Sequence, residues 1–360
     1  MIAAGRAVMV RPVAVQPLAG GSMTEPLSDV RDISKIAYGF FASKALFAAL
    51  HLELFGHLAE GPAALDTLAE RTGVAPNRLA TLLANLAAMG LVAQNTGRYI
   101  NSPAAARYLV PGQPAYFGDY YRFQIDRHLY PSMMAIDAGL RGDEANLAHA
   151  SMSGMLEDPV EAEAFSRAQH AGSLGPALLL AKLLDLTGAA SLLDVAGGTG
   201  AYSIVLARQY PELTSTIIDF PTVTAVAERY IGEAGLGDRI ALLPGNALDV
   251  DWPGDQDAIL MSYLISAVGE GDISELLRRA HTALKPGGTL IVHDFMLDDD
   301  RSGPSSAAGF FLGYLTWRVD PVSFSAAELE PWLTKAGFED PRTDIMIPEI
   351  TKYTLARKPG

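Results

Sequence analysis

The residues with the most specific chemistry lie in a glycine-rich segment, LLDVAGGTG, at positions 192–200. Glycines in such a segment let the backbone turn tightly into a helix and approach a ligand closely. Asp219 ends the next apolar run, nineteen positions after Gly200. A carboxylate at this spacing can accept hydrogen bonds from both ribose hydroxyls of an adenine nucleoside. The two features together predict a binding site for a nucleoside cofactor.

Two other interpretations of this segment are weaker. A dinucleotide site has glycine or alanine at the last position of G-x-G-x-x-G. This chain has Ser203 there, and the segment follows a long helical stretch, which is the wrong placement for that motif. A glycine-rich turn that binds no ligand would have no need for the carboxylate of Asp219.

An aromatic segment at residues 116–130, YFGDYYRFQIDRHLY, carries a first candidate for a general base. His128 lies in it together with Arg122 and Arg127. This combination could bind a phenol, lower its pKa and hold its anion, or it could bind a carboxylate. The same residue types also suit a helix with cations on its surface and aromatic rings in the core. Both interpretations stay open at this point.

Two further histidines lie near the predicted sheet. His170 is in the helical stretch that precedes the sheet, and His293 closes an apolar run together with Asp294. Ligands of open α/β sheets lie at the carboxyl ends of the strands, so both histidines are candidates for a general base. His293 would equally suit the core, held by a backbone carbonyl.

Aromatic residues recur at helical spacing near the end of the chain, at Phe310, Phe311, Tyr314 and Trp317. Such a stripe usually packs in a core, although a planar substrate would use the same surface. The chain has no cysteine and no H-E-x-x-H or similar ligand spacing. We therefore expect no metal site.

Composition limits the partners that the chain can have. It has 360 residues, 49% of them apolar, which is enough for two domains with sizeable cores. A formal net charge of −14 and the lack of any basic run argue against nucleic acid and membranes as partners. Pro12 and Pro17 interrupt the apolar residues near the start, so we expect no signal peptide. A cytoplasmic protein fits these features.

The first half of the chain has the pattern of a helical domain. Residues 30–58 are apolar on more than one helical face, so they must be covered by their own domain or by a second subunit. Residues 63–102 predict two helices separated by a turn at 73–76, then a hairpin closed at 95–97, which is a winged helix. Only Arg78 gives the second helix a cation, too little charge for binding DNA. We therefore expect this unit to be a scaffold.

After residue 188 the pattern changes to short apolar runs separated by helical segments. The runs are SLLDVAGG, STIIDFP, RIALLPGN, DAILMSYLI and GGTLIVHDFML, and ITKYTLARKP near the end reads as one more strand. Strands that alternate with helices predict a Rossmann-like α/β fold with a doubly wound, mostly parallel sheet.

Four short motifs in this region resemble a known family. DVAGGTG at 194–200, DFP at 219–221, LKPGG at 284–288 and AGF at 336–338 are similar to motifs of the class I methyltransferases of the small-molecule O-methyltransferase type. That group includes plant caffeate-type enzymes, bacterial antibiotic-tailoring enzymes and bacteriochlorophyllide C-methyltransferases. The resemblance covers nearly the whole chain from about residue 30, and it implies S-adenosylmethionine as cofactor and S-adenosylhomocysteine as product.

The resemblance also implies roles for individual residues. The positions that match its cofactor-binding residues are Asp194, Gly198, Gly200, Asp219, Phe220, Asn246 and Ser173. Among them Asp194 and the two glycines belong under the methionine portion, and Asn246 replaces the family's usual acid near the adenine. Ala196 stands where the family has its first glycine, and its Cβ restricts the turn.

The resemblance breaks down at the usual catalytic base. The family has L-H-D-W after its fourth strand, and here Ser266 stands in place of the histidine, followed by Ala267 and Val268. A serine hydroxyl is a poor general base near neutral pH. Holding the acceptor in line with the activated methyl group would still supply much of the rate acceleration. In the family's acceptor pocket we expect Ser266, Phe311 and Tyr314, with Arg122 and Arg127 as further substrate-binding residues.

These observations lead to one domain plan. We expect a disordered tail or a mis-assigned start at 1–28, an all-α winged-helix dimerisation domain at 29–110, and a helical linker and substrate-lid region at 111–186. The methyltransferase domain would occupy 187–360. The expected function is methylation, on oxygen or carbon, of a small aromatic natural product by a homodimer. The alternatives are a family member that binds the cofactor but acts as a cyclase or hydroxylase, and a non-catalytic scaffold.

Overall fold

A computed structural model describes residues 26–148, 152–318 and 320–360. Most of the predicted tail, residues 1–25, lies outside these ranges. The chain forms two compact units, Glu25–Tyr130 and Pro131–Gly360, each taken by itself below. The division falls after Tyr130 rather than near residue 110, because residues 120–130 pack on helix α2. Phe47 of that helix meets the Tyr130 ring edge-on, with ring centroids 6.0 Å apart.

The N-terminal unit is mainly helical. Its elements are α1 Val30–Ala37, α2 Gly39–His51, α3 Leu54–Ala59, β1 Ala63–Ala64, α4 Leu65–Thr72, α5 Pro76–Ala88, β2 Val92–Asn95, β3 Arg98–Asn101, α6 Pro103–Tyr108 and the π-helix Tyr120–Leu129. Leucines on α3, α4 and α5 form its core, with Leu54, Leu68 and Leu79 fully buried. Burial of these apolar side chains is the main force that holds the short helices together.

The predicted winged-helix pattern is present in this unit. Helix α4 ends at Gly73, whose φ of 68° is the left-handed conformation that stops a helix, and α5 begins with Pro76. Thr96 and Gly97 connect β2 to β3 with φ values of 48° and 77°, as a two-residue hairpin turn requires. Strand β1 pairs with β3, which adds a third short strand to the predicted hairpin.

The C-terminal unit alternates strands and helices. Its helices are α7 Tyr130–Ser132, α8 Ile136–Arg141, α9 Met152–Leu156, α10 Pro159–Leu183, α11 Ala201–Gln209, α12 Pro221–Glu233, α13 Glu270–Ala283, α14 Ser305–Tyr314 and α15 Ala326–Lys335. Its strands are β4 Ser191–Val195, β5 Thr214–Asp219, β6 Ile240–Pro244, β7 Gln256–Ser262, β8 Leu284–Asp294, β9 Glu339–Ile347 and β10 Thr351–Arg357. Single 3₁₀ turns lie at Met133–Ala135, Glu144–Asn146 and Ile265–Ala267.

The strands form one sheet of seven in the order β6-β5-β4-β7-β8-β10-β9. The first five are parallel, and β10 runs antiparallel to both β8 and β9. Because β4 lies between β5 and β7, the strand order reverses at its carboxyl end, where open α/β sheets bind ligands. The register places Val195 opposite Ile218 on β5 and Met261 on β7, so the loops after these strands leave the sheet at one edge.

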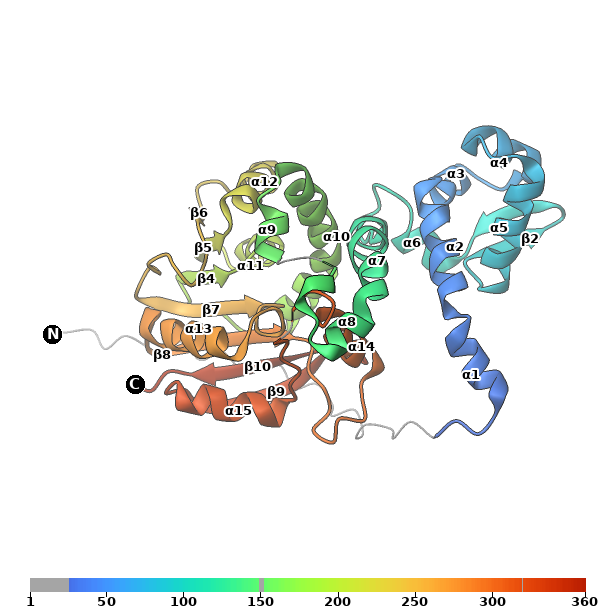
Figure 1. Cartoon of the computed structure of the whole chain (residues 1–360). Coiled ribbons are helices and arrows are strands. Elements are labelled where there is room, and N and C mark those ends of the chain that lie inside the picture. The colour runs from blue at the N-terminus through green and yellow to red at the C-terminus, as the bar shows by residue number, and fades with distance from the viewer. Residues whose placement is uncertain (1–25, 149–151, 319) are drawn as a thin grey trace. The chain divides into compact units, whose positions relative to one another are not determined.

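Helices cover both faces of the sheet (Figure 1). One face packs against α10 and α11 through a core that includes Leu180, Leu192 and Leu260. The other packs against α13, α14 and α15 through a larger core that includes Leu193, Ile259 and Leu277. The predicted doubly wound α/β fold is therefore confirmed, with one difference at its end. The sequence indicated one terminal strand, whereas β9 and β10 form an antiparallel pair there.

Candidate active site

The glycine-rich turn follows β4 and leads directly into α11. Gly200 caps the helix with a φ of 78°, in the left-handed region that glycine adopts without strain. A Cβ at this position would lie 2.7 Å from Cδ1 of Ile217 on the neighbouring strand. Glycine at 200 therefore lets the helix begin directly against β5, at the edge where the strand order reverses.

Ala196 takes an unusual conformation in the same turn. Its φ is 55°, which only a few per cent of residues other than glycine adopt. The turn therefore keeps the backbone shape of a glycine with an alanine in place. This agrees with the expectation that the Cβ of Ala196 strains the turn.

Asp219 is held at the end of β5 by two backbone hydrogen bonds. The Gly198 N–H donates to Oδ2 at 2.8 Å, and the Phe220 N–H donates to Oδ1 at 2.7 Å. A carboxylate offers about four acceptor sites, so each oxygen keeps one for a ligand hydroxyl. Burial raises the pKa of Asp219 to about 6, against the lowering effect of the two N–H donors. The Asp219 carboxylate is therefore ionised at neutral pH and held in place to accept hydrogen bonds from a diol.

Asp194 lies beneath the turn and is almost completely buried. Its Oδ2 accepts a hydrogen bond from the Ser203 hydroxyl at 2.7 Å, while its Oδ1 has no hydrogen-bond partner among the described residues. A Cβ at Gly197 would lie 2.6 Å from the carboxyl carbon, so the turn passes directly over this group. Burial raises the pKa of Asp194 to about 6, and the negative charge of Asp219 adds to the rise. An unsatisfied buried oxygen is costly unless a ligand or water meets it.

Helix α10 joins the turn through His170. The His170 ring lies 2.7 Å from the Thr199 hydroxyl, measured from Nδ1 to Oγ1, and stacks on Tyr230 of α12 with ring centroids 3.9 Å apart. Burial lowers the pKa of His170 to about 4, so its imidazole is neutral at physiological pH. His170 therefore ties α10 to the turn and to α12. Ser173, on the same helix, is half-buried.

The remaining predicted cofactor residues follow β5 and β6. Phe220 packs partly buried against a cluster that contains Leu156 and Val223. The Asn246 Oδ1 accepts a hydrogen bond from the Leu248 N–H at 3.0 Å, which fixes the amide in the loop after β6. The amide NH₂ is then the part of Asn246 that could meet an adenine nitrogen.

Ser266 is buried and bound to a carboxylate on the next strand. Its hydroxyl donates to Oδ1 of Asp294 at 2.6 Å, and its backbone N–H donates to Oδ2 at 3.0 Å. The Phe295 N–H adds a third hydrogen bond at 2.8 Å. Burial raises the pKa of Asp294 to about 6, and the Ser266 hydroxyl is the largest opposing influence. No local sequence pattern predicts this pair, because its two residues lie far apart in the chain.

The aromatic residues of α14 and the turn after it range from buried to partly exposed. Phe311 is buried and packs on Phe324 with ring centroids 5.7 Å apart, so its ring belongs mainly to the core. Phe310 stacks on Phe295 at 4.1 Å. The hydroxyl of Tyr314, a partly exposed residue, lies 3.5 Å from the Ser266 hydroxyl. Trp317 is also buried.

His293 is part of the core. Its Nδ1 lies 3.0 Å from the Tyr202 hydroxyl and 2.9 Å from that of Ser262, and its Nε2 lies 3.0 Å from that of Thr351. Burial lowers the pKa of His293 to about 3. With both nitrogens engaged by hydroxyls, the arrangement favours a structural role over that of a general base. Its partners are side-chain hydroxyls, whereas the core alternative for His293 had a backbone carbonyl as partner.

The third candidate histidine belongs to the N-terminal unit. His128 is buried near the end of the π-helix, Arg122 is mostly buried 3.7 Å from Asp119, and Arg127 is exposed. The Nε of Arg122 has no hydrogen-bond partner among the residues described. On its residue types, this segment stays a candidate for acceptor binding.

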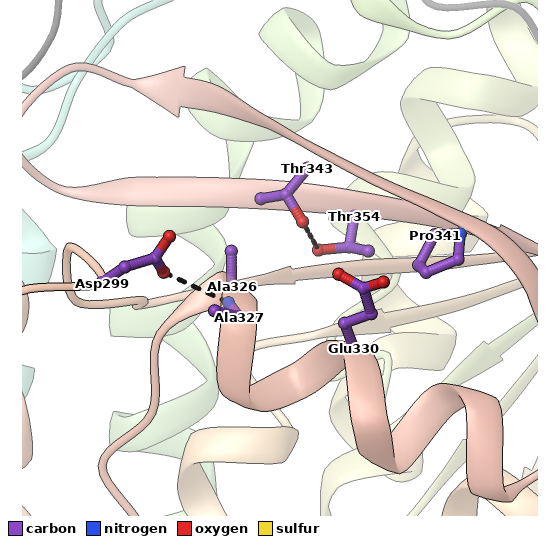
Figure 2. A pocket seen from close by; sticks show the side chains of 7 residues that line it. All are labelled: Asp299, Ala326, Ala327, Glu330, Pro341, Thr343 and Thr354. Carbon is purple, nitrogen blue, oxygen red and sulfur yellow. Dashed lines mark hydrogen bonds between the residues drawn. The ribbon is translucent and has the colours of Figure 1, made fainter.

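A small cavity lies elsewhere in the C-terminal unit, between α15 and the β9–β10 pair (Figure 2). It measures about 180 Å³ and is lined by Asp299, Ala326, Ala327, Glu330, Pro341, Thr343 and Thr354. The two threonine hydroxyls lie 2.7 Å apart, and Asp299 accepts a hydrogen bond from the Ala327 N–H at 3.2 Å. These polar groups bind one another, and none belongs to the edge of the sheet that carries Asp194, Asp219 and Asp294.

Comparison with known proteins decides the family. An O-methyltransferase domain model matches residues 149–339, and an O-methyltransferase dimerisation domain model matches residues 34–111. The chain belongs to the O-methyltransferase family. It is thus an S-adenosylmethionine-dependent methyltransferase with an N-terminal dimerisation domain.

Individual members of the O-methyltransferase family resemble the chain over most of its length. The 3-hydroxy-5-methyl-1-naphthoate 3-O-methyltransferase of Streptomyces sahachiroi is 33% identical over 86% of this chain and 90% of its own. The L-tyrosine C(3)-methyltransferase of Streptomyces lavendulae is 30% identical over 89% of this chain and 90% of its own. The structure of human N-acetylserotonin methyltransferase in complex with S-adenosylmethionine has the same fold. The two structures align with a TM-score of 0.82 and 24% sequence identity, and the alignment covers 94% of this chain and 100% of the human chain.

The described residues fit the cofactor of this O-methyltransferase family. Asp219 has acceptor sites for a diol, and Asp194 presents a buried oxygen without a partner under the glycine turn. Sequence reasoning missed Thr199, Tyr230 and Ser203, which hold the site together. The sequence signal available for Thr199 and Ser203 was only their place in and just after the glycine-rich segment, and for Tyr230 there was none.

Proposed function

We propose that the protein transfers a methyl group to a phenolic hydroxyl of a small aromatic natural product. The observation that carries this proposal is the edge of the sheet where the strand order reverses. There the Asp219 site lies on the same edge as Ser266, Asp294 and the partly exposed Tyr314. A cofactor site beside aromatic rings and a hydroxyl suits a planar acceptor. The naphthoate acceptor in the name of the Streptomyces sahachiroi relative supports the same class.

The cofactor would be held by the residues that the resemblance identifies. Asp219 would accept hydrogen bonds from the two ribose hydroxyls, and Asn246 would bond the adenine edge. The ring of Phe220 would lie beside the nucleoside. Asp194 would accept a hydrogen bond from the methionine portion, directly or through water. Once bound, S-adenosylmethionine supplies a methyl group on a positively charged sulfur. Gly198 and Gly200 would shape the turn beneath its methionine portion, and Ser173 would face it.

In the C-terminal unit, recognition of the acceptor would fall to α14. Arg122 and Arg127 suit a carboxylate or a phenolate, because a guanidinium donates paired hydrogen bonds to such groups. Tyr314 would contact the planar ring, and Phe311, whose ring packs in the core and meets that of Tyr314 edge-on, would support it. His170 and His293 are weak candidates for the base, because their nitrogens already face hydroxyl groups, and His128 stays a candidate from the sequence.

An assay with labelled cofactor tests this function. The purified protein is incubated with methyl-deuterated S-adenosylmethionine and 3-hydroxy-1-naphthoate, and the product is analysed by mass spectrometry and NMR. The proposal expects one label per acceptor, located on the phenolic oxygen. A label on a ring carbon, or no labelled product from a panel of hydroxylated naphthoates and polyketide phenols, would overturn it.

Carbon methylation is the second candidate. The L-tyrosine C(3)-methyltransferase relative supports it, and the histidine base of the family is absent at Ser266. The same NMR measurement separates the two outcomes, since a methyl on oxygen and a methyl on carbon differ in chemical shift. The family match and the cofactor residues do not favour a cyclase or hydroxylase.

We also propose that the protein is a homodimer built on α1 and α2. Large apolar side chains are exposed along these helices: Val30, Ile33, Ile36, Tyr38, Phe40 and Phe41. Val30–His51 is also the one stretch among the described residues with the length and composition of a membrane span. Tyr38 interrupts it and Lys35 and Lys44 lie within it, which suits a protein interface better. The dimerisation domain match from residue 34 supports this interpretation.

A further inference from the structure

We propose that Tyr314, Ser266 and Asp294 form a relay that removes the proton from the acceptor hydroxyl. The proposal rests on the proposed O-methylation, because only a hydroxyl acceptor needs to lose its proton in this way. It assigns a use to the serine that replaces the family's histidine. It also assigns one to a buried carboxylate that the function has not otherwise explained.

The geometry orders the three groups from the partly exposed Tyr314 inwards. Tyr314 is partly exposed, and its hydroxyl lies 3.5 Å from the Ser266 hydroxyl. The Ser266 hydroxyl donates to Oδ1 of Asp294 at 2.6 Å, the length of a strong charge-assisted hydrogen bond. Asp294 itself is fully buried, so it cannot meet an acceptor directly. Among the described residues, the side-chain path that these distances define from Asp294 runs through Ser266 to Tyr314.

The proton transfer balances along this path. Three protons move together. The acceptor O–H proton passes to the Tyr314 oxygen, the Tyr314 proton passes to Ser266 Oγ, and the Ser266 proton passes to Asp294 Oδ1. Both hydroxyls end as they began, Asp294 becomes neutral, and the acceptor oxygen keeps the electron pair of its broken O–H bond. The reverse path returns the proton to solvent after the product leaves.

Asp294 is suited to receive a proton near neutral pH. Burial raises its pKa to about 6, so the carboxylate is ionised at pH 7 but accepts a proton more readily than an exposed aspartate. The titratable side chains that face it are Tyr202 from α11 and Tyr314 from α14. Asp294 makes no ion pair with any residue described in the structure, so no cation holds its pKa down.

The separation between Tyr314 and Ser266 is the longest step. At 3.5 Å it exceeds the usual 2.5–3.0 Å of an O–H···O hydrogen bond, whereas catalytic hydrogen bonds often tighten only when substrate binds. Phe310 of the same helix stacks on Phe295, next to Asp294 in the chain, which holds α14 close to the end of β8. A small shift of the Tyr314 ring is therefore enough to close the path.

Acceptors of different acidity test the relay. The variants Tyr314→Phe, Ser266→Ala and Asp294→Asn are assayed with 3-hydroxy-1-naphthoate, whose hydroxyl is neutral near pH 7, and with its 4-nitro derivative, whose hydroxyl is ionised. The relay predicts that kcat for the neutral acceptor falls by about 10²–10⁴-fold in each variant. It predicts little change for the ionised acceptor, which has no proton to lose. Wild-type kcat for the neutral acceptor should also decline below about pH 6, and the Asp294→Asn rate should lack this decline.

Matched controls come from buried hydroxyls outside the site. Tyr353→Phe and Ser166→Ala remove hydroxyls that are buried and have no hydrogen-bond partner among the described residues. Both controls should keep wild-type rates with either acceptor. Equal losses on the two acceptors in the relay variants would show a structural role and overturn the relay. A selective loss on the neutral acceptor in His128→Gln alone would overturn it in favour of the histidine.

A measurement without turnover separates the relay from the proposed function. The carboxyl ¹³C signal of Asp294 is assigned by its loss in Asp294→Asn, or by its shift in Tyr314→Phe if that variant does not fold, and is followed against pH. The relay predicts a pKa above the ordinary aspartate range, which rises further in Ser266→Ala because a hydrogen bond to the carboxylate is lost. Titration at or below the ordinary range overturns the relay. A wild type that methylates neither acceptor would instead count against the proposed function.

Discussion

Ala196 carries the local strain of the cofactor turn. Its left-handed backbone costs an alanine about 1–2 kcal/mol, whereas glycine adopts it freely. A glycine also makes the unfolded chain more flexible, and this reduces the gain in stability by about 0.4–1 kcal/mol. We therefore expect Ala196→Gly to raise the free energy of unfolding by up to about 1 kcal/mol, measured by urea denaturation. Ala225→Gly on the exposed face of α12 should instead lower it. Destabilisation by both variants would contradict the strain.

Asp219 predicts how cofactor binding depends on pH. The ribose hydroxyls donate to its ionised form, so binding favours the carboxylate and weakens as the carboxylate takes up a proton. With a pKa of about 6, the affinity for S-adenosylhomocysteine should be constant above pH 7 and about tenfold lower at pH 5. Calorimetric titration across this range measures it. Because Asp194 has a similar pKa, the group is identified by Asp219→Asn, which should flatten the profile, whereas an unchanged profile would exclude Asp219.

The sequence identified single residues well where local spacing decides their position. Asp219 and Gly200 could be predicted because each lies at the end of a strand or the start of a helix. The surroundings of His293 could not, since its partners come from α11, β7 and β10. Which hydroxyls meet around one imidazole depends on how distant elements pack, and no local pattern records that.

At the scale of elements, α10 is connected to the glycine turn by one side chain. His170→Phe keeps an aromatic ring to stack on Tyr230 but removes the hydrogen bond to Thr199. Losing one such bond typically costs about 0.5–1.5 kcal/mol. We therefore expect S-adenosylhomocysteine to bind about 2–10-fold more weakly, as measured by calorimetry.

A double-mutant cycle gives the control for this connection. Thr199→Val should weaken binding by a similar factor, and the double variant should be no weaker than either single one, because both remove the same interaction. Fully additive losses would mean that His170 and Thr199 act separately.

Most elements could be predicted from periodicity, and the exceptions have a physical reason. The hairpin at Thr96–Gly97 and the parallel strands follow from turn residues and apolar runs. Strand β9 was not predicted, because it lies at the edge of the sheet, contains Pro341 and is largely exposed. Edge strands are commonly polar and tolerate proline, so their sequences lack the apolar pattern of buried strands.

For the whole molecule, the exposed apolar face of α1 and α2 predicts an association between two copies. Burying such side chains against a partner removes them from water, and a charge in the centre of that interface would oppose it. We expect the wild type to be a dimer at micromolar concentration and Phe41→Glu to be mainly monomeric, measured by light scattering after size exclusion. Val160→Glu, at an exposed apolar residue of α10, should remain dimeric. A monomeric wild type would contradict this assembly.

The central claim is that Asp219 holds the cofactor at the edge where the strand order reverses, and one calorimetric comparison tests it. S-adenosylhomocysteine is titrated at about pH 7.5 into the wild type and into the variants Asp219→Asn and Asp257→Asn. Asp257 is the matched control, because it also accepts two backbone N–H bonds, from Ala190 and Ser191, but lies on β7 near its amino end. We predict that Asp219→Asn loses about 1–3 kcal/mol of binding free energy, roughly 5–150-fold in affinity, and that Asp257→Asn binds like the wild type. Equal affinities for wild type and Asp219→Asn would contradict the account.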